Sequence, residues 1–274
     1  MQRILVAVLG LTLTTGLSAG CTQQRISAEK AVARAFISDE EEEKLGKQVK
    51  AELETKEKIK YVEDPAVVDY VRGISASILK QASKDRPGVK WKIHVIDDPK
   101  TVNAFATPGG YLYVYTGLIL AADTEAELAG VMAHEAGHVV GRHSARAMVN
   151  QMGLQTITQA ALGKNPGTVA QIAAQLVSGG TMLAHGRGEE IEADEYGARY
   201  ASGAGYDPRG LVTFFEKLQK EQGDTPAMMK WLSTHPTNRD RIANIQKIIS
   251  EKKLRGSNNG PGGLPPIKQS LGGK

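Results

Sequence analysis

Apolar residues recur at helical spacing along the first part of the chain. Leucine and valine occupy every fourth position from 45 to 53, which predicts a helix that begins near Asp39. The glutamates at 40–43 are expected to form its solvated first turn, where the helix dipole favours acidic side chains. A second helix is expected to begin at Asp64-Pro65 and to end at Arg86-Pro87-Gly88.

The next segments alternate between apolar and polar residues, which is the pattern of extended strands. Residues 91–96 predict a strand, and His94 lies on its polar face, where a surface residue is more typical than a metal ligand. Residues 103–106 and 111–116 flank the turn Thr107-Pro108-Gly109-Gly110 and predict a hairpin. The alanines of the first run leave its backbone approachable by an extended substrate.

A strongly apolar helix is predicted over residues 128–142, and it carries the only clear catalytic motif. His134 and His138 are four residues apart, so their imidazoles lie one above the other on one face. Two imidazoles in this arrangement can occupy two corners of a zinc tetrahedron. Glu135 points beside the metal rather than at it, which suits the base for a zinc-bound water.

The third zinc ligand is not on the same helix. A metzincin pattern would require histidine at Ser144, whereas His143 falls one residue short and lies about 140° round the helix from His138. A carboxylate from another helix is the alternative, and five acidic residues cluster between 189 and 195. Glu190 and Asp194 share one face of that helix, whose small residues at 193, 197, 198 and 201 allow close approach to the first helix.

The rest of the chain is predicted to be mostly helical. Helices are expected over 151–165, 169–183, about 208–218 and 238–252, so the fold class is α+β with a small sheet beside the zinc helix. The Gly- and Pro-rich tail at 256–274 is expected to be disordered.

Three motifs in sequence order carry a resemblance to a known family over about residues 39–252. They are Asn103-Ala104-Phe105-Ala106 with Pro108-Gly109-Gly110, the His134–His138 motif, and Glu190-x-x-Ala193-Asp194 followed by His235-Pro236 and Arg241. Together they resemble the HtpX/BepA/LoiP-like zinc metallopeptidases, the minigluzincins related to the CAAX prenyl endopeptidases. The chain is most similar to the short bacterial lipoproteins of that family, since it has neither a 20-residue apolar span nor a C-terminal repeat array.

The resemblance implies roles for individual residues. Glu190 would be the third zinc ligand, and Asp194 would support a ligating histidine from outside the coordination shell. Asn103, with Ala104 and Phe105, would hold the substrate as an added strand. His235 and Arg241 would lie near the oxyanion, although Arg241 can also be read as a helix-surface charge. Glu189, Glu192 and Glu195 are expected to be solvated helix surface.

Composition and the N-terminal segment change this picture in two respects. The 274 residues carry a formal charge of +4 with no basic stripe, which argues against a nucleic-acid partner. Residues 1–20 are interpreted as a signal peptide that ends just before Cys21, the only cysteine. The residues around this junction resemble a lipobox. A lone cysteine is otherwise a small buried apolar residue. Residues 21–38 would then form a tether, and 39–255 the zinc metallopeptidase domain, of zincin-like fold by the resemblance.

These features predict a zinc endopeptidase with one Zn²⁺ per chain. By resemblance, it would be lipid-anchored to a bacterial outer membrane, face the periplasm and degrade misfolded or unassembled envelope proteins, in possible association with the outer-membrane assembly machinery. Two alternatives stay open: an assembly factor with chaperone-like action and latent protease activity, and a zinc hydrolase of cell-wall peptides. His235 is either a latch on the fourth zinc position or a donor to the oxyanion.

Overall fold

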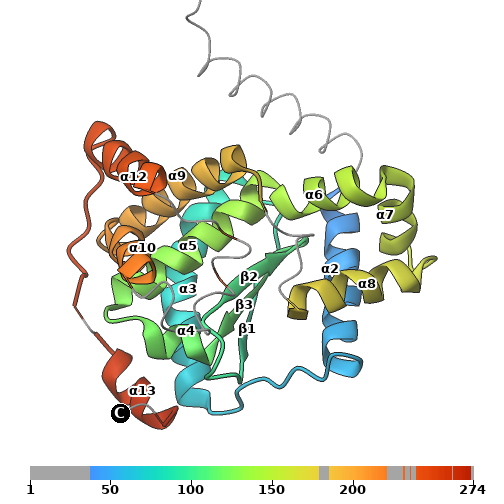
Figure 1. Ribbon diagram of the computed structural model, residues 1–274, viewed down its shortest axis with the longest axis horizontal. Helices are drawn as coiled ribbons and strands as arrows, with labels where there is room; N and C mark the ends of the chain where they lie inside the picture. The colour runs from blue at the N-terminus through green and yellow to red at the C-terminus, as the bar shows by residue number, and fades with distance from the viewer. Residues whose placement is uncertain are drawn as a thin grey trace, which may run out of the picture.

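The computed structural model describes residues 38–178, 185–220, 231, 235, 239–260 and 262–272. Within these ranges a small sheet lies between two groups of helices (Figure 1). No helix among them has the length and hydropathy needed to cross a membrane. The helices are α2 (Asp39–Thr55), α3 (Pro65–Asp85), α4 (Thr116–Ala121), α5 (Glu125–Gly141), α6 (His143–Met152), α7 (Leu154–Ala161), α8 (Pro166–Ser178), α9 (Arg187–Gly203), α10 (Gly210–Lys220), α12 (Arg239–Glu251) and α13 (Leu264–Ser270).

The sheet has three strands, β1 (Lys92–Ile96), β2 (Ala104–Thr107) and β3 (Tyr111–Tyr115), in the order β1-β3-β2. β2 and β3 form the predicted antiparallel hairpin, and β1 runs parallel to β3. β2 is therefore an edge strand. The α+β class and the predominance of helix expected from the sequence are both confirmed.

Each face of the sheet contributes to a separate apolar core, because side chains alternate along the strands. On one face, residues such as Ala106 and Leu112 pack with α3, α5 and α10. On the other, residues such as Phe105 and Tyr113 pack with α2, α7 and α8. His94 lies on this second face, half-buried against Tyr113 with ring centroids 5.3 Å apart, so it is neither fully exposed nor a ligand.

Helix α5 is the central element and is buried around almost its whole circumference. Thr124 caps its N-terminus by accepting a hydrogen bond from the backbone N–H of Glu127. The helix ends one residue earlier than predicted, because Arg142 adopts a left-handed conformation with φ of 59°. α6 then begins at His143 in a new direction.

The two N-terminal helices begin where the sequence predicts, but the first turn of α2 is not wholly solvated. Ser38 forms a capping box with Glu41, and Asp64 caps α3 ahead of Pro65. Glu42, expected in solvent, is 1% exposed and accepts a hydrogen bond of 2.9 Å from Arg86 Nη2. A cation from α3 thus makes burial of this carboxylate possible.

The expectation of a disordered tail was wrong for the described part of 256–274. Leu264 and Ile267 of α13 are buried against the main core. The preceding loop is fixed on Glu125, whose carboxylate accepts hydrogen bonds from Gly263 N at 2.7 Å and Asn258 Nδ2 at 3.0 Å. Glycine and proline serve here as turn and helix-start residues, so their abundance did not signify disorder.

Candidate active site

Two glycines allow α5 and α9 to cross at close range. A Cβ atom on Gly137 would lie 3.0 Å from the backbone oxygen of Ala193, and one on Gly197 would lie 3.2 Å from the backbone nitrogen of His134. A side chain at either position would force the two helices apart, by more at Gly137 than at Gly197. This close crossing, expected from the small residues of α9, brings acidic side chains of α9 against the histidines of α5.

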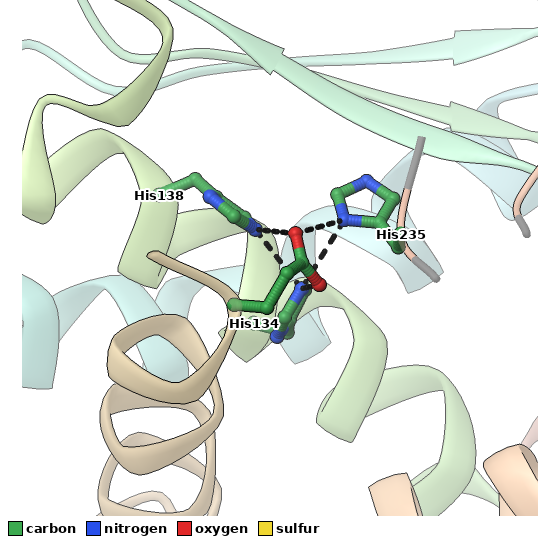
Figure 2. A group of neighbouring side chains, drawn as sticks. His134, His138 and His235 are labelled. Carbon is green, nitrogen blue, oxygen red and sulfur yellow. Dashed lines mark hydrogen bonds and ion pairs between the residues drawn. The ribbon is translucent and has the colours of Figure 1, made fainter. Parts of the chain in front are cut away.

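Four side chains converge at the crossing, and each offers one donor atom (Figure 2). They are His134, His138, Glu190 and His235, all at most 2% exposed, and their donor atoms lie within 4.8 Å of one another. His134 Nε2 is 3.0 Å from His138 Nε2 and 3.6 Å from Glu190 Oε2, and His138 Nε2 is 3.4 Å from Glu190 Oε1.

These separations are close to those of a tetrahedral metal site. Zinc bonds of about 2.0–2.2 Å place tetrahedral ligand atoms about 3.3–3.6 Å apart. The two distances to Glu190 lie in that range, whereas the 3.0 Å between the two histidine nitrogens is shorter and would have to lengthen by a few tenths of an ångström. Burial alone would raise the pKa of Glu190, but the charge of Arg241 and hydrogen bonds from the two histidines of α5 hold that pKa well below its usual range, which keeps the carboxylate ionised.

His235 occupies the remaining corner of the cluster. Its Nδ1 lies 3.1 Å from Glu190 Oε1 and 3.4 Å from His134 Nε2. Its ring stacks on Trp231 with centroids 4.2 Å apart. Burial lowers the pKa of His235 to about 4, so its imidazole is neutral and can offer a lone pair.

Asp194 and Arg241 lie behind the donors rather than among them. Asp194 Oδ1 is 3.0 Å from His134 Nδ1, the ring nitrogen that points away from the cluster. Arg241 is 1% exposed and donates to both oxygens of Asp194, at 2.8 and 2.6 Å, while its Nη1 lies 2.5 Å from Glu190 Oε2. Arg241 therefore joins the two carboxylates of α9 and is not a helix-surface charge.

His134 is strongly coupled to these carboxylates. Burial opposes its protonation, but hydrogen bonds with Asp194 and Glu190 outweigh burial and raise the pKa of His134 to about 9. A metal ion that binds His134 would therefore have to displace a proton at neutral pH.

His138 has a partner that the sequence analysis missed. His143 Nδ1 lies 2.8 Å from His138 Nδ1, and His143 Nε2 lies 3.2 Å from Glu192 Oε2. His143 was rejected as a metal ligand and is outside the donor cluster, but it is fully buried beside it. Glu192 was expected to be solvated surface, and so was Glu189, which lies 3.4 Å from Arg146; both expectations were wrong.

Glu135 lies between the donor cluster and the edge strand. Its carboxylate accepts a hydrogen bond from the backbone N–H of Ala106, and its Oε1 is 3.4 Å from His235 Nε2. Burial raises the pKa of Glu135 to about 8. A carboxylate with a pKa close to neutral pH is well matched to proton transfer.

The backbone of β2 runs along the active-site side of the sheet. The backbone N–H of Tyr115 donates to Asn103 O, so the alternate residues Ala104 and Ala106 direct their N–H and C=O groups away from β3. Ser144 Oγ donates to Ala106 O at 3.2 Å. The Asn103 side chain is buried and its Oδ1 lacks a hydrogen-bond partner among the described residues.

Other predicted residues lie outside the site. The side chain of Phe105 stacks on Tyr113 in the second core, with ring centroids 4.6 Å apart, and the backbone of Phe105 pairs with β3. Glu195 pairs with Lys252 at 3.1 Å on the surface, as expected. Cys21, and with it the signal peptide and tether, lies outside the described residues.

Comparison with known proteins finds relatives among the metallopeptidases. The sequence profile of Peptidase family M48 matches residues 69–249. The mitochondrial metalloendopeptidase OMA1 of Schizosaccharomyces pombe is 34% identical over 61% of this chain and 49% of its own length. OMA1 of Arabidopsis thaliana is 38% identical over 58% of this chain and 32% of its own length. The beta-barrel assembly-enhancing protease of Escherichia coli is 28% identical over 70% of this chain and 41% of its own length. The chain thus spans half the length of these relatives or less.

Proposed function

The chain belongs to peptidase family M48, and from that premise we propose that it is a zinc-dependent endopeptidase. The observation that carries the proposal is the buried cluster of His134, His138 and Glu190 with Glu135 beside it. A purely structural zinc site has no need of an ionisable carboxylate next to its ligands.

Zinc fits this donor set better than other common ions. Two imidazoles and one carboxylate, with a fourth position that can open, match the ligands of catalytic zinc, whereas calcium and magnesium prefer oxygen alone. When bound, zinc would lower the pKa of a coordinated water and polarise the scissile carbonyl.

Glu135 supplies the proton transfers. Its carboxylate takes a proton from the attacking water and delivers it to the leaving nitrogen of the cleaved peptide, an effect of roughly 10²–10⁴-fold on rate. The N–H of Ala106 orients this carboxylate in the free protein. Arg241 fixes Glu190 and Asp194 in place, so we assign it a positioning role rather than contact with the oxyanion.

The substrate would add to β2 as an extended strand. The outward N–H and C=O groups of Ala104 and Ala106 supply main-chain hydrogen bonds with little demand on sequence. The Oδ1 of Asn103, which has no hydrogen-bond partner within the described ranges, supports a contact with substrate backbone, because a buried acceptor without a partner is unfavourable. Ser144 would release Ala106 O when a substrate strand pairs there.

His235 would hold the free enzyme in a closed state. Its Nδ1 is the fourth donor atom of the cluster, so His235 would have to withdraw before water or a substrate could reach a metal held by the other three residues. This geometry also favours the second candidate function, an assembly factor whose protease activity is latent. In either case an arriving strand would displace the imidazole.

The proposals on location and substrates rest on the sequence and on the names of the relatives. We propose that Cys21 is lipidated, that the protein lies on the periplasmic face of the outer membrane, and that its substrates are misfolded or unassembled envelope proteins. Association with the outer-membrane assembly machinery belongs to the same proposal. Cys21→Ser should yield a soluble periplasmic chain or an unprocessed precursor, and a mature-length variant that still fractionates with the outer membrane would exclude this anchor.

The test of the activity compares wild type with Glu135→Gln on casein and on an unfolded outer-membrane protein. We expect cleavage by the wild type and a loss of about 10²–10⁴-fold in the variant at equal zinc content. His235→Ala is assayed in parallel, so that a closed site is not mistaken for an inactive one. Equal turnover with and without Glu135, or zinc-loaded wild type and His235→Ala that both cleave nothing, would overturn the proposal.

A further inference from the structure

His143 and Glu192 lie in line behind His138, on the side away from the donor cluster. We propose that these two residues form a hydrogen-bond relay that fixes His138 in its metal-binding tautomer and orientation. The inference rests on the proposed function, since it concerns one ligand of the same metal site. It assigns roles to two residues whose positions in the sequence suggest none.

The distances determine how the protons are placed. His138 Nε2 faces the donor cluster, so a bound metal requires its lone pair and leaves the ring proton on Nδ1. That N–H can donate only to an unprotonated nitrogen, which His143 Nδ1 provides at 2.8 Å. A neutral His143 then carries its own proton on Nε2 and donates it to Glu192 Oε2 at 3.2 Å.

The two histidine ligands are thus supported in parallel ways. His134 reaches a carboxylate directly, since its Nδ1 lies 3.0 Å from Asp194. His138 reaches one through an intervening imidazole. A carboxylate at the end of such a chain increases the basicity of the ligating nitrogen and fixes the ring.

The backbone between the ligand and its partner is shaped for this contact. A Cβ on Gly141 would lie 2.2 Å from His143 Nε2, so only glycine leaves room for the imidazole. Arg142 then takes the left-handed conformation, which is uncommon for a residue other than glycine and turns His143 back toward His138. Arg142 Nε lies 3.4 Å from Glu42 Oε1, and its guanidinium also pairs with Asp39.

A histidine buried only for packing has different surroundings in this same protein. His94 lies among tyrosine rings, and its Nε2 is buried without a hydrogen-bond partner in the described part of the chain. Both nitrogens of His143, by contrast, face a polar atom at hydrogen-bond distance. Packing alone explains the position of His94, but it does not explain why both ring nitrogens of His143 have polar partners.

The experiment measures zinc affinity by competition with a chelator and the visible spectrum of the Co²⁺-substituted protein. We expect His143→Ala to weaken zinc binding about 10–100-fold and to change the cobalt spectrum. Glu192→Ala should shift both in the same direction by less, and the double variant should be no weaker than His143→Ala. His143→Gln, whose amide offers both an acceptor and a donor, should recover part of the affinity.

The matched control is Glu195→Ala, which removes a surface carboxylate from the same helix and should change neither measurement. The relay is refuted if Glu192→Ala matches this control, or if His143→Ala lowers only the melting temperature. Failure of the proposed function is distinguishable, because it would appear as a zinc-loaded chain that cleaves nothing, while zinc affinity and the cobalt spectrum could still be compared between the variants. If the unmodified chain binds zinc and the His143 and Glu192 variants bind it equally well, only the relay is refuted.

Discussion

Replacement of Gly137 by alanine tests whether the close crossing of α5 and α9 creates the metal site. The new methyl carbon would lie 2.9 Å from Tyr196 Cβ and 3.0 Å from Ala193 O. Carbon atoms are at their optimal separation at about 3.5–4.0 Å, so α9 must move away by several tenths of an ångström. Glu190 precedes Ala193 by one turn of the same helix and must move with it.

The effect on folding should be modest, because two contributions oppose each other. Overpacking a buried contact costs about 1–3 kcal/mol, whereas alanine is favoured over glycine within a helix by about 1 kcal/mol. The net loss of up to about 2 kcal/mol corresponds to a fall in melting temperature of no more than about 8 °C for a domain of this size. Zinc affinity should fall by about tenfold or more, since the carboxylates that bind and orient the ligands shift relative to His134 and His138.

Two further glycines make the measurement decisive. A Cβ on Gly73 of α3 would meet nothing within 4 Å, so Gly73→Ala should leave zinc affinity unchanged and raise stability by up to about 1 kcal/mol. Gly197→Ala, with its nearest contact at 3.2 Å, should lie between the two. Thermal unfolding and chelator competition on the three variants provide the data. Equal zinc affinity in Gly137→Ala and Gly73→Ala would refute the reasoning.

Three shorter predictions concern the site itself. If His235 is a latch, His235→Ala should raise peptide turnover or leave it intact; a fall of about 10²–10³-fold with zinc retained would instead identify an oxyanion donor. Glu190→Gln should lose most bound zinc while Glu195→Gln keeps it, and equal zinc content in both would remove Glu190 from the ligands. His134 is protonated below its pKa of about 9, and zinc must displace that proton in order to bind. The apparent zinc affinity should therefore fall about tenfold for each unit by which the pH is lowered from 9 to 7. An affinity that does not change over this range would contradict the assignment of His134 as a ligand.

The clustering of the candidate ligands could be predicted from the sequence because each pair depends on spacing within one regular helix. His134 and His138 share a face of α5, and Glu190 and Asp194 share a face of α9, so the period of 3.6 residues is sufficient. The hairpin was equally local, since its turn residues lie between two short apolar runs. Contact between the two helices was inferred from small residues, which permit close approach.

The relay behind His138 could not be predicted in the same way. The helical period placed His143 about 140° round the helix from His138, but this angle applies only if the helix continues to His143. The break occurs at Arg142, and an arginine gives no signal for a left-handed residue. What stabilises this conformation is remote in sequence, since Asp39 and Glu42 come from α2, about one hundred residues earlier.

The same remoteness explains the buried Glu42 and the ordered tail, and it shows how the ends of the domain support the catalytic helix. At the start of α5, Glu125 N donates to Gly260 O at 3.0 Å while the Glu125 carboxylate receives Gly263 N. At its end, Arg86 Nη1 donates to Val139 O at 2.6 Å, and Glu42 accepts from the same arginine. Segments next to the first and last described helices therefore fix opposite ends of one helix whose middle carries the donor cluster. If that cluster holds zinc as proposed, a ligand displaced by a fraction of an ångström would lose affinity for the metal, so residues far from the site in sequence would contribute to zinc binding through the placement of α5.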